Sequence, residues 1–274
     1  MNKVFFGDCR DSMRELIAQG VKVQMCVTSP PYFGLRDYGH DGQLGLEATP
    51  TEYVVAMVEV FALVHELLAD DGVLWLNLGD SYARAGGWSN NNGLDGVKRG
   101  EGNRAMSNMT GEGGASQKLA DGLKPKDLIG IPWRVAFALQ ADGWYLRQDI
   151  IWHKPNPMPE SVTDRCTKAH EYIFLLSKSA RYYFDSAAIA EPAKPDTSVR
   201  DRDSTRLNNT PGRNRMGGLT VNDYESRNKR SVWTVPTTPY SGAHFATFPP
   251  ALIEPCILAG SRVGDTVLDP FFGS

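Results

Sequence analysis

A largely apolar run leads straight into a rigid turn in the segment Val23-Gln24-Met25-Cys26-Val27-Thr28-Ser29-Pro30-Pro31-Tyr32. The run predicts a short buried strand, because a few apolar residues bounded by turn residues are typical of a sheet core. Proline lacks an N–H and fixes φ near about −65°, so the turn is stiff and rich in free carbonyls. A hydroxyl, a carbonyl and the ring of Tyr32 suit a flat ligand that bears an amino group. On its own, the segment fits an ordinary strand followed by a turn as well as it fits a site for such a ligand.

The residues around this segment alternate between predicted strands and helices. At 49–52, Thr-Pro-Thr-Glu has the form of a helix start, with Thr49 as the cap and Pro50 at the first helical position. We expect strands at 4–6, 23–27, 73–78, 145–152 and 172–177, and helices at 12–18, from 50 to about 70, at 132–140 and at 251–259. Short joints between strand and helix predict a doubly wound α/β core.

A second informative segment lies at the other end of the chain, Val263-Gly264-Asp265-Thr266-Val267-Leu268-Asp269-Pro270-Phe271-Phe272-Gly273-Ser274. It reads as a turn, a short strand, an acidic residue and a glycine-containing loop. With the Thr-Ser-Pro-Pro-Tyr motif some 240 residues earlier, it resembles the circularly permuted (beta-class) DNA methyltransferases that modify cytosine N4 or adenine N6. The resemblance implies a Rossmann-like α/β sheet, S-adenosyl-L-methionine (AdoMet) as methyl donor, double-stranded DNA as partner, and an irregular DNA-recognition insert.

The amino group of a nucleobase is a poor nucleophile, because its lone pair is delocalised into the ring. Hydrogen-bond acceptors that strengthen as the nitrogen becomes tetrahedral can draw that lone pair out. We assign this role to the Ser29 hydroxyl and the Pro30 carbonyl, with Pro31 fixing the turn and Tyr32 stacking on the extruded base. A cysteine nucleophile is not expected, because Cys256 lies on a predicted helix and Cys26 within a strand.

The resemblance also implies residues for the cofactor, and because it predicts DNA as the partner, several basic residues become candidates for DNA binding. The cofactor-binding candidates are Asp8, Cys9, Thr28, His244, Phe248, Asp269, Pro270, Phe271 and Gly273. Two of these residues also fit an ordinary structural role without a cofactor, Asp8 in a turn and His244 in a loop. The DNA-binding candidates are Arg36, Lys154, Arg213, Arg215, Lys229 and Arg230. Lys154 and Arg36 are also consistent with ordinary surface cations.

Composition limits the class of protein. The chain has 274 residues, a net charge of −3 and four cysteines without a CxxC pair, so neither a metal site nor a disulfide scaffold is expected. We expect a cytoplasmic protein of bacterial or phage origin without a membrane partner, since no apolar stretch reaches the roughly 18 residues of a span. The segment 194–230 holds nine Lys or Arg against five Asp or Glu. A local excess of this kind is enough to meet phosphates, although it also fits a solvated loop.

We divide the chain into a catalytic core at 1–185 with a mobile loop near 86–122, a target-recognition insert at 186–243, and the cofactor-loop end of the core at 244–274. Because the resembled family continues beyond the glycine loop, we expect a truncated core, weak AdoMet binding and impaired activity. Serine at the first position of Ser-Pro-Pro-Tyr favours cytosine N4 over adenine N6. The alternatives are an adenine N6 enzyme and a non-catalytic DNA-binding remnant, while RNA or protein methylation is disfavoured by the motif order. A separate restriction nuclease could be the partner.

Overall fold

A computed structural model describes residues 2–35, 39, 42–83, 122–193, 225–238 and 248–272. Five of the predicted site residues lie outside these ranges: Arg36, Arg213, Arg215, His244 and Gly273. Almost all of the loop expected near 86–122 lies outside them as well. None of the described helices combines the length and apolar character that crossing a membrane requires.

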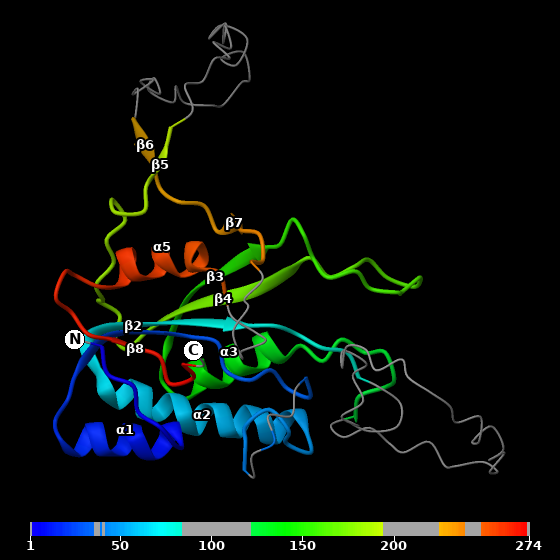
Figure 1. The fold of residues 1–274 in the computed structure, drawn as a ribbon, viewed down its shortest axis with the longest axis horizontal. Coiled ribbons are helices and arrows are strands. Elements are labelled where there is room, and N and C mark those ends of the chain that lie inside the picture. The colour runs from blue at the N-terminus through cyan, green and yellow to red at the C-terminus, as the bar shows by residue number, and fades with distance from the viewer. Residues whose placement is uncertain are drawn as a thin grey trace, which may run out of the picture.

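A mixed six-stranded sheet forms the centre of the protein, in the order β7-β3-β4-β2-β1-β8 (Figure 1). Its strands are β1 (Val23–Thr28), β2 (Leu68–Leu78), β3 (Tyr145–His153), β4 (His170–Ser177), β7 (Val232–Thr234) and β8 (Val267–Leu268). β1 runs parallel to β2 and β8, and β3 runs parallel to β7. β4 runs antiparallel to both β2 and β3, so the other five strands of the described sheet run in one direction and β4 runs in the opposite one.

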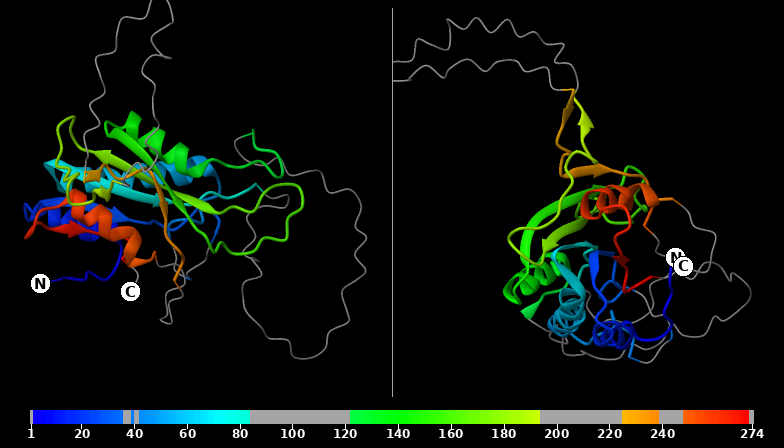
Figure 2. Two further views of the ribbon diagram at one scale, coloured as in Figure 1. Left: turned by 90° about the horizontal axis from the view of Figure 1, so that it is seen from above. Right: turned by 90° about the vertical axis from the view of Figure 1, so that its left-hand side faces the viewer.

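Helices cover both faces of the sheet, as Figures 1 and 2 show. On one face lie α1 (Cys9–Ala18), α2 (Pro50–Leu67) and α3 (Ile131–Ala141), and on the other lies α5 (Pro250–Gly260). The alternation of β2 explains the two layers: Leu74 and Leu76 pack toward the three helices, while Val73 and Trp75 pack toward α5. The predicted α/β architecture is therefore confirmed.

A separate two-stranded ribbon projects from this core (Figure 1). It pairs β5 (Glu191–Pro192) with β6 (Ser226–Arg227) in antiparallel fashion. An ion pair joins Arg227 Nη2 to Glu191 Oε2 at 3.4 Å, and the Ala193 amide donates to the Glu225 carbonyl at 3.0 Å. The ribbon thus brings together the two ends of the segment 194–224.

The expected helix starts and ends are reproduced within a few residues. Thr49 caps α2, its side chain accepting a hydrogen bond from the Glu52 amide at 3.1 Å, and Pro50 is the first residue of the helix. The helix ends at Leu67 rather than near 70, and β2 begins at once. The strand predicted at 4–6 is wrong: these residues have no regular structure and the Phe6 side chain is 96% exposed. An apolar triplet forms a strand only where a neighbour supplies the ladder of hydrogen bonds, and no described strand pairs with it.

Candidate active site

The parallel strands β1 and β8 place the two sequence motifs side by side. Cys26 pairs with Leu268, so Thr28 and Asp269 follow at the same edge of the sheet. Thr28 Oγ1 donates a hydrogen bond to Asp269 Oδ1 at 2.5 Å. The Phe271 amide donates to the same oxygen at 3.0 Å. Both described hydrogen bonds reach Oδ1, which leaves Oδ2 to accept from a ligand.

Burial determines the protonation behaviour of this carboxyl group. It raises the pKa of Asp269 above its ordinary value, and the hydrogen bonds from Thr28 and Phe271 offset only part of the effect. Phe271 packs against the core beneath α1 and α2, whereas Phe248 packs against the opposite cluster beside α5. Pro270 lies between Asp269 and Phe271, so these three cofactor candidates directly follow β8, whereas Phe248 precedes α5.

The Ser-Pro-Pro-Tyr turn is held from outside by two neighbours. The Tyr53 hydroxyl on α2 donates to the Pro31 carbonyl at 2.9 Å. Gly45 adopts a φ of +99°, and a Cβ there would lie 3.1 Å from Pro31 Cβ and 3.2 Å from the Tyr32 carbonyl oxygen. Pro30 is buried, and no described residue donates to its carbonyl. The turn is therefore fixed while the Pro30 acceptor stays available.

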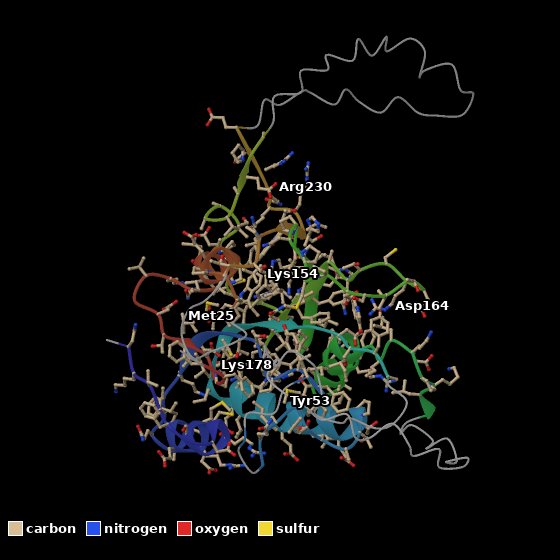
Figure 3. The ribbon with its side chains drawn as sticks, turned by 45° about the vertical axis from the view of Figure 1, so that its right-hand side comes forward. Met25, Tyr53, Lys154, Asp164, Lys178 and Arg230 are labelled. Carbon is tan, nitrogen blue, oxygen red and sulfur yellow. The ribbon has the colours of Figure 1, made fainter. Side chains whose placement is uncertain are left out.

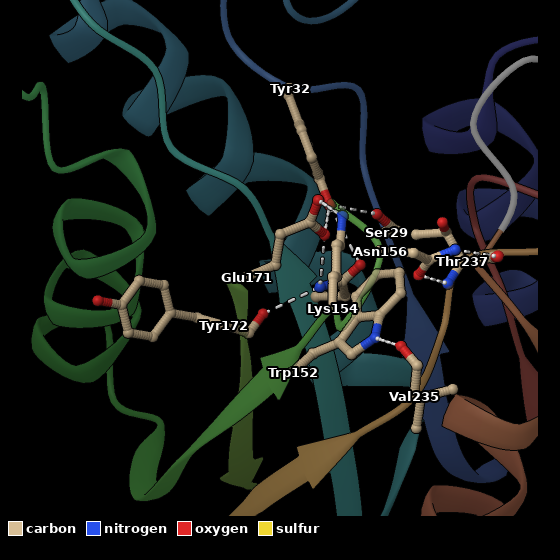
Figure 4. A network of polar contacts seen from close by, with 10 residues as sticks. Ser29, Tyr32, Trp152, Lys154, Asn156, Glu171, Tyr172, Val235 and Thr237 are labelled. Atoms are coloured by element: carbon tan, nitrogen blue, oxygen red, sulfur yellow. Dashed lines mark hydrogen bonds and ion pairs between the residues drawn. The ribbon is translucent and has the colours of Figure 1, made fainter. Parts of the chain in front are cut away.

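The Tyr32 hydroxyl joins a network of polar groups from β2, β4 and the turn after β1 (Figure 4). It receives a hydrogen bond from Ser29 Oγ at 3.4 Å and donates its one proton to Glu171 Oε2 at 2.7 Å, while Asn77 Oδ1 lies 3.1 Å away as a second, more distant acceptor. The Asn77 amide nitrogen donates to the Tyr172 carbonyl at 3.0 Å, which fixes its orientation. Burial, followed by the charge of Glu171, raises the pKa of Tyr32 well above its ordinary value. The phenol therefore stays protonated and can donate.

The backbone of Gly79 lies close against the Tyr32 ring. A Cβ at Gly79 would come within 2.5 Å of Tyr32 Cε2 and 2.9 Å of Cδ2, which real contacts do not allow. Glycine is therefore required directly after β2, because only its backbone leaves room for the aromatic ring. Gly79 thus lies against the Cδ2–Cε2 side of the ring, and the ring hydroxyl is tied to the network.

Lys154 lies inside this site rather than on the outer surface (Figures 3 and 4). Its ammonium forms an ion pair with Glu171 Oε1, and the side chains of Lys154 and Glu171 are only 18% and 16% exposed. The same ammonium lies 4.2 Å from the centroid of the Trp152 ring, whose Nε1 donates to the Val235 carbonyl at 2.8 Å. A contact between Lys154 and DNA stays a prediction.

Asp8 and Cys9 stand at the start of α1. The Asp8 carboxylate accepts from the Arg10 amide at 2.8 Å and forms an ion pair with the Arg10 guanidinium, which lowers the pKa of Asp8. Asp8 is thus the N-cap of α1, and its contact with a cofactor stays a prediction. Burial raises the pKa of the Cys9 thiol.

The two cysteines assigned to the core are buried there. Cys26 lies within β1 and Cys256 within α5, and both side chains are fully buried. Burial raises the pKa of each thiol, so neither is disposed to form a thiolate.

The described cations of the predicted DNA-binding set lie beside β7. Lys229 stands 5.1 Å from the centroid of the Trp233 ring, and the Arg230 carbonyl accepts from Trp233 Nε1 at 2.7 Å. Arg230 itself is exposed, below the β5–β6 ribbon (Figure 3). The backbone here is anchored while the cationic head of Arg230 remains in solvent.

Three residues that contact Tyr32 are not among the predicted site residues: Asn77, Gly79 and Glu171. Asn77 carried a signal, because it is the one polar residue in the run Leu74-Trp75-Leu76-Asn77-Leu78 and is buried. A buried amide usually has hydrogen-bond partners. Gly79 and Glu171 carried no comparable signal, since their partner Tyr32 is far from both in sequence.

The sequence profile of a DNA methylase family, N6_N4_Mtase, matches residues 23–274. The type II methyltransferase M.SmaI of Serratia marcescens is 47% identical over 273 residues, covering 99% of this chain and 80% of that protein. M.Cfr9I of Citrobacter freundii is 47% identical over 271 residues, covering 99% and 76%.

Solved structures share the fold. PvuII DNA methyltransferase (cytosine-N4-specific) superposes with a TM-score of 0.57 at 16% identity, covering 97% of this chain and 72% of that one. A putative DNA modification methylase of Thermus thermophilus, solved in complex with S-adenosyl-L-methionine, gives 0.51 at 21% identity, covering 99% and 79%. The profile match and the close relatives together establish that this chain belongs to the N6/N4 family of DNA methylases, among the type II DNA methyltransferases.

Proposed function

We propose that this protein transfers a methyl group from AdoMet to the N4 amino group of a cytosine extruded from duplex DNA. The observation that carries the proposal is the hydrogen bond from Thr28 to Asp269, which joins the Ser-Pro-Pro-Tyr turn to the Asp-Pro-Phe loop. A methyl donor beside Asp269 and an acceptor base beside Ser29 would then be neighbours. The permuted arrangement is supported by chain order, since β1 precedes β8.

The residues around Asp269 fit AdoMet. Asp269 Oδ2 can accept from the ammonium or hydroxyl groups of this cofactor, and Thr28 and the Phe271 amide hold the carboxylate in place. Phe248, Pro270 and Phe271 supply apolar surface, and Asp8 and Cys9 complete the set we assign. AdoMet supplies an electrophilic methyl group on a sulfonium, which needs no further activation.

The remaining chemistry belongs to the turn. Ser29 Oγ and the Pro30 carbonyl accept hydrogen bonds from the target amino group and strengthen as its nitrogen becomes tetrahedral, each worth roughly 2–4 kcal/mol. Extrusion of the base costs a few kcal/mol. Stacking of the base on Tyr32, worth about 1–3 kcal/mol, offsets part of this cost.

DNA recognition is assigned to the segment 186–243, between a core at 1–185 and the cofactor-loop end at 244–274. The β5–β6 ribbon and the exposed Arg230 support this assignment, since both stand at the ends of the basic segment. Lys229, Arg230 and, in the same role, Lys154 are the described candidates for phosphate contacts. As a type II modification enzyme, the protein would be paired with a separate restriction nuclease.

The test is methyl transfer from labelled AdoMet to duplex DNA, followed by digestion to nucleosides and mass spectrometry. We expect N4-methylcytosine, and its loss in Ser29→Ala. N6-methyladenine would instead establish the adenine alternative. DNA binding without transfer would establish the non-catalytic alternative and refute the proposal.

A further inference from the structure

A chain of hydrogen bonds connects the proposed catalytic serine to a carboxylate on β4 (Figure 4). Ser29 Oγ donates to the Tyr32 hydroxyl at 3.4 Å, and the Tyr32 hydroxyl donates to Glu171 Oε2 at 2.7 Å. Each hydroxyl directs its single proton toward Glu171. Ser29 Oγ therefore presents only lone pairs to the target amino group.

Glu171 is held on both of its oxygens. Oε2 accepts from Tyr32 and, at 3.3 Å, from the Asn77 amide nitrogen, while Oε1 is paired with the Lys154 ammonium. The antiparallel register sets this geometry, because Glu171 pairs with Trp152 on β3 and Asn77 pairs with Ile173 on β4. A carboxylate fixed in this way can orient a phenol without moving itself.

We infer that Glu171 is a positioning residue for methyl transfer, acting through Tyr32, and the final acceptor of the proton that the amino group loses. The inference rests on the proposed function. As the bond from sulfur to the methyl carbon breaks, its electron pair stays on sulfur and the nitrogen lone pair forms the new bond to carbon. The nitrogen then gives a proton to Ser29 Oγ, Ser29 gives its own to Tyr32, and Tyr32 gives its own to Glu171. One proton is lost from the base and one gained by the carboxylate.

The experiment is a double-mutant cycle on the single-turnover rate, with Glu171→Gln, Tyr32→Phe and the double variant. Gln keeps the size of the side chain and an acceptor for Tyr32 but is a far weaker proton acceptor, and Phe breaks the chain in the middle. We expect the single-turnover rate of each single variant to fall at least about 100-fold, because assisted proton transfer typically contributes about 10²- to 10⁴-fold. The double variant should be no slower than the slower single variant, and the KM for AdoMet should not change.

Glu160→Gln is the matched control, because Glu160 lies on the connection that leads into β4 and pairs with Arg165 outside this chain of hydrogen bonds. It should keep the wild-type rate. Glu171→Asp, which keeps the charge but is one methylene shorter, replaces Glu171→Gln if that variant melts early, and the same loss is expected. Additive effects in the cycle, or a wild-type rate in either Glu171 variant, would overturn the inference alone. Absence of transfer by the wild-type protein would overturn the proposed function and this inference together.

Discussion

Thr28 Oγ1 and Asp269 Oδ1 lie 2.5 Å apart, although 241 residues separate them in the chain. Strand pairing brings them together, since Cys26 and Leu268 are partners in the parallel ladder of β1 and β8. A hydroxyl that donates to a largely buried carboxylate links the turn assigned to the base with the loop assigned to the cofactor. Any change at this contact should therefore affect both stability and cofactor affinity.

Thr28→Val removes the hydroxyl while it keeps the shape of the side chain. The Asp269 carboxylate then loses one of its two described donors, and we expect the free energy of unfolding to fall by about 1–3 kcal/mol. Weaker orientation of Asp269 should also lower AdoMet affinity by about tenfold, which corresponds to ~1.4 kcal/mol. Urea denaturation and calorimetric titration measure the two effects. The exposed Thr167→Val serves as control, and equal behaviour of both variants would contradict the expectation.

Asp269→Asn tests the effect of burial on this carboxyl group. Its folded pKa is raised above the ordinary 3.8, so the folded state holds the proton more tightly than the unfolded state. Stability from this group is therefore fully present below 3.8 and is lost as the pH rises through the raised value. Asparagine keeps the oxygen that both donors reach and carries no charge. We expect Asp269→Asn to be more stable than wild type at about pH 8, with a smaller difference at about pH 4.

Urea denaturation at the two pH values gives this comparison directly. Asp11→Asn is the control, because it also removes one negative charge but at an exposed position on α1. A stability gain for Asp269→Asn that is equal at both pH values would show that burial of charge is not its cause. The stabilised variant should bind AdoMet more weakly, because asparagine offers no negative charge to the cofactor's ammonium group.

Gly79→Ala should displace the Tyr32 ring. The new methyl group would stand 2.5 Å from Tyr32 Cε2, so the ring and its hydroxyl must move. Because displacement of a reacting group by about 1 Å can lower a rate ~100-fold, we expect a loss of that order in single-turnover methylation. Gly20→Ala adds the same methyl group at a turn with φ +71° and open space around it. That control should lose about 1–2 kcal/mol of stability and keep its activity; a wild-type rate in Gly79→Ala would contradict the assigned position of Tyr32.

Arg230→Gln should weaken DNA binding in a salt-dependent way. If Arg230 contacts one phosphate, the slope of log K against log salt should fall by about 0.9. Arg14→Gln removes another exposed cation, from α1, and should leave the slope unchanged. Fluorescence anisotropy over a range of salt concentrations measures both, and an unchanged slope in Arg230→Gln would remove this residue from the interface.

Local sequence signals were sufficient to predict most of the described helices and strands. Thr49, Pro50 and Glu52 specify the start of α2 within four residues, and the apolar run after Gly72 specifies the buried end of β2. The residues 4–6 have the composition of a strand as well, yet they lack a partner among the described strands. Strand formation depends on a remote neighbour, and composition does not supply one.

The contacts of the candidate site also differ in whether the sequence predicts them. That Thr28 and Asp269 would meet could be expected, because both follow short strands and carry motifs of one family. The contact of Tyr32 with Glu171 could not, because it depends on the antiparallel register of β2, β4 and β3. The sequence therefore pointed to the turn residues that we assign to the substrate, but not to Glu171, the strand residue that contacts Tyr32.

The short β5–β6 ribbon holds the two ends of the segment 194–224 next to each other. Ala193 and Glu225 are hydrogen-bonded to each other, so the chain leaves the core and returns to it at one point. A loop that starts and ends at one place can change in length or composition without moving the strands that carry the chemistry. Under the proposed assignment of DNA recognition to the segment 186–243, relatives could therefore exchange this segment and recognise new target sequences while they keep the central sheet.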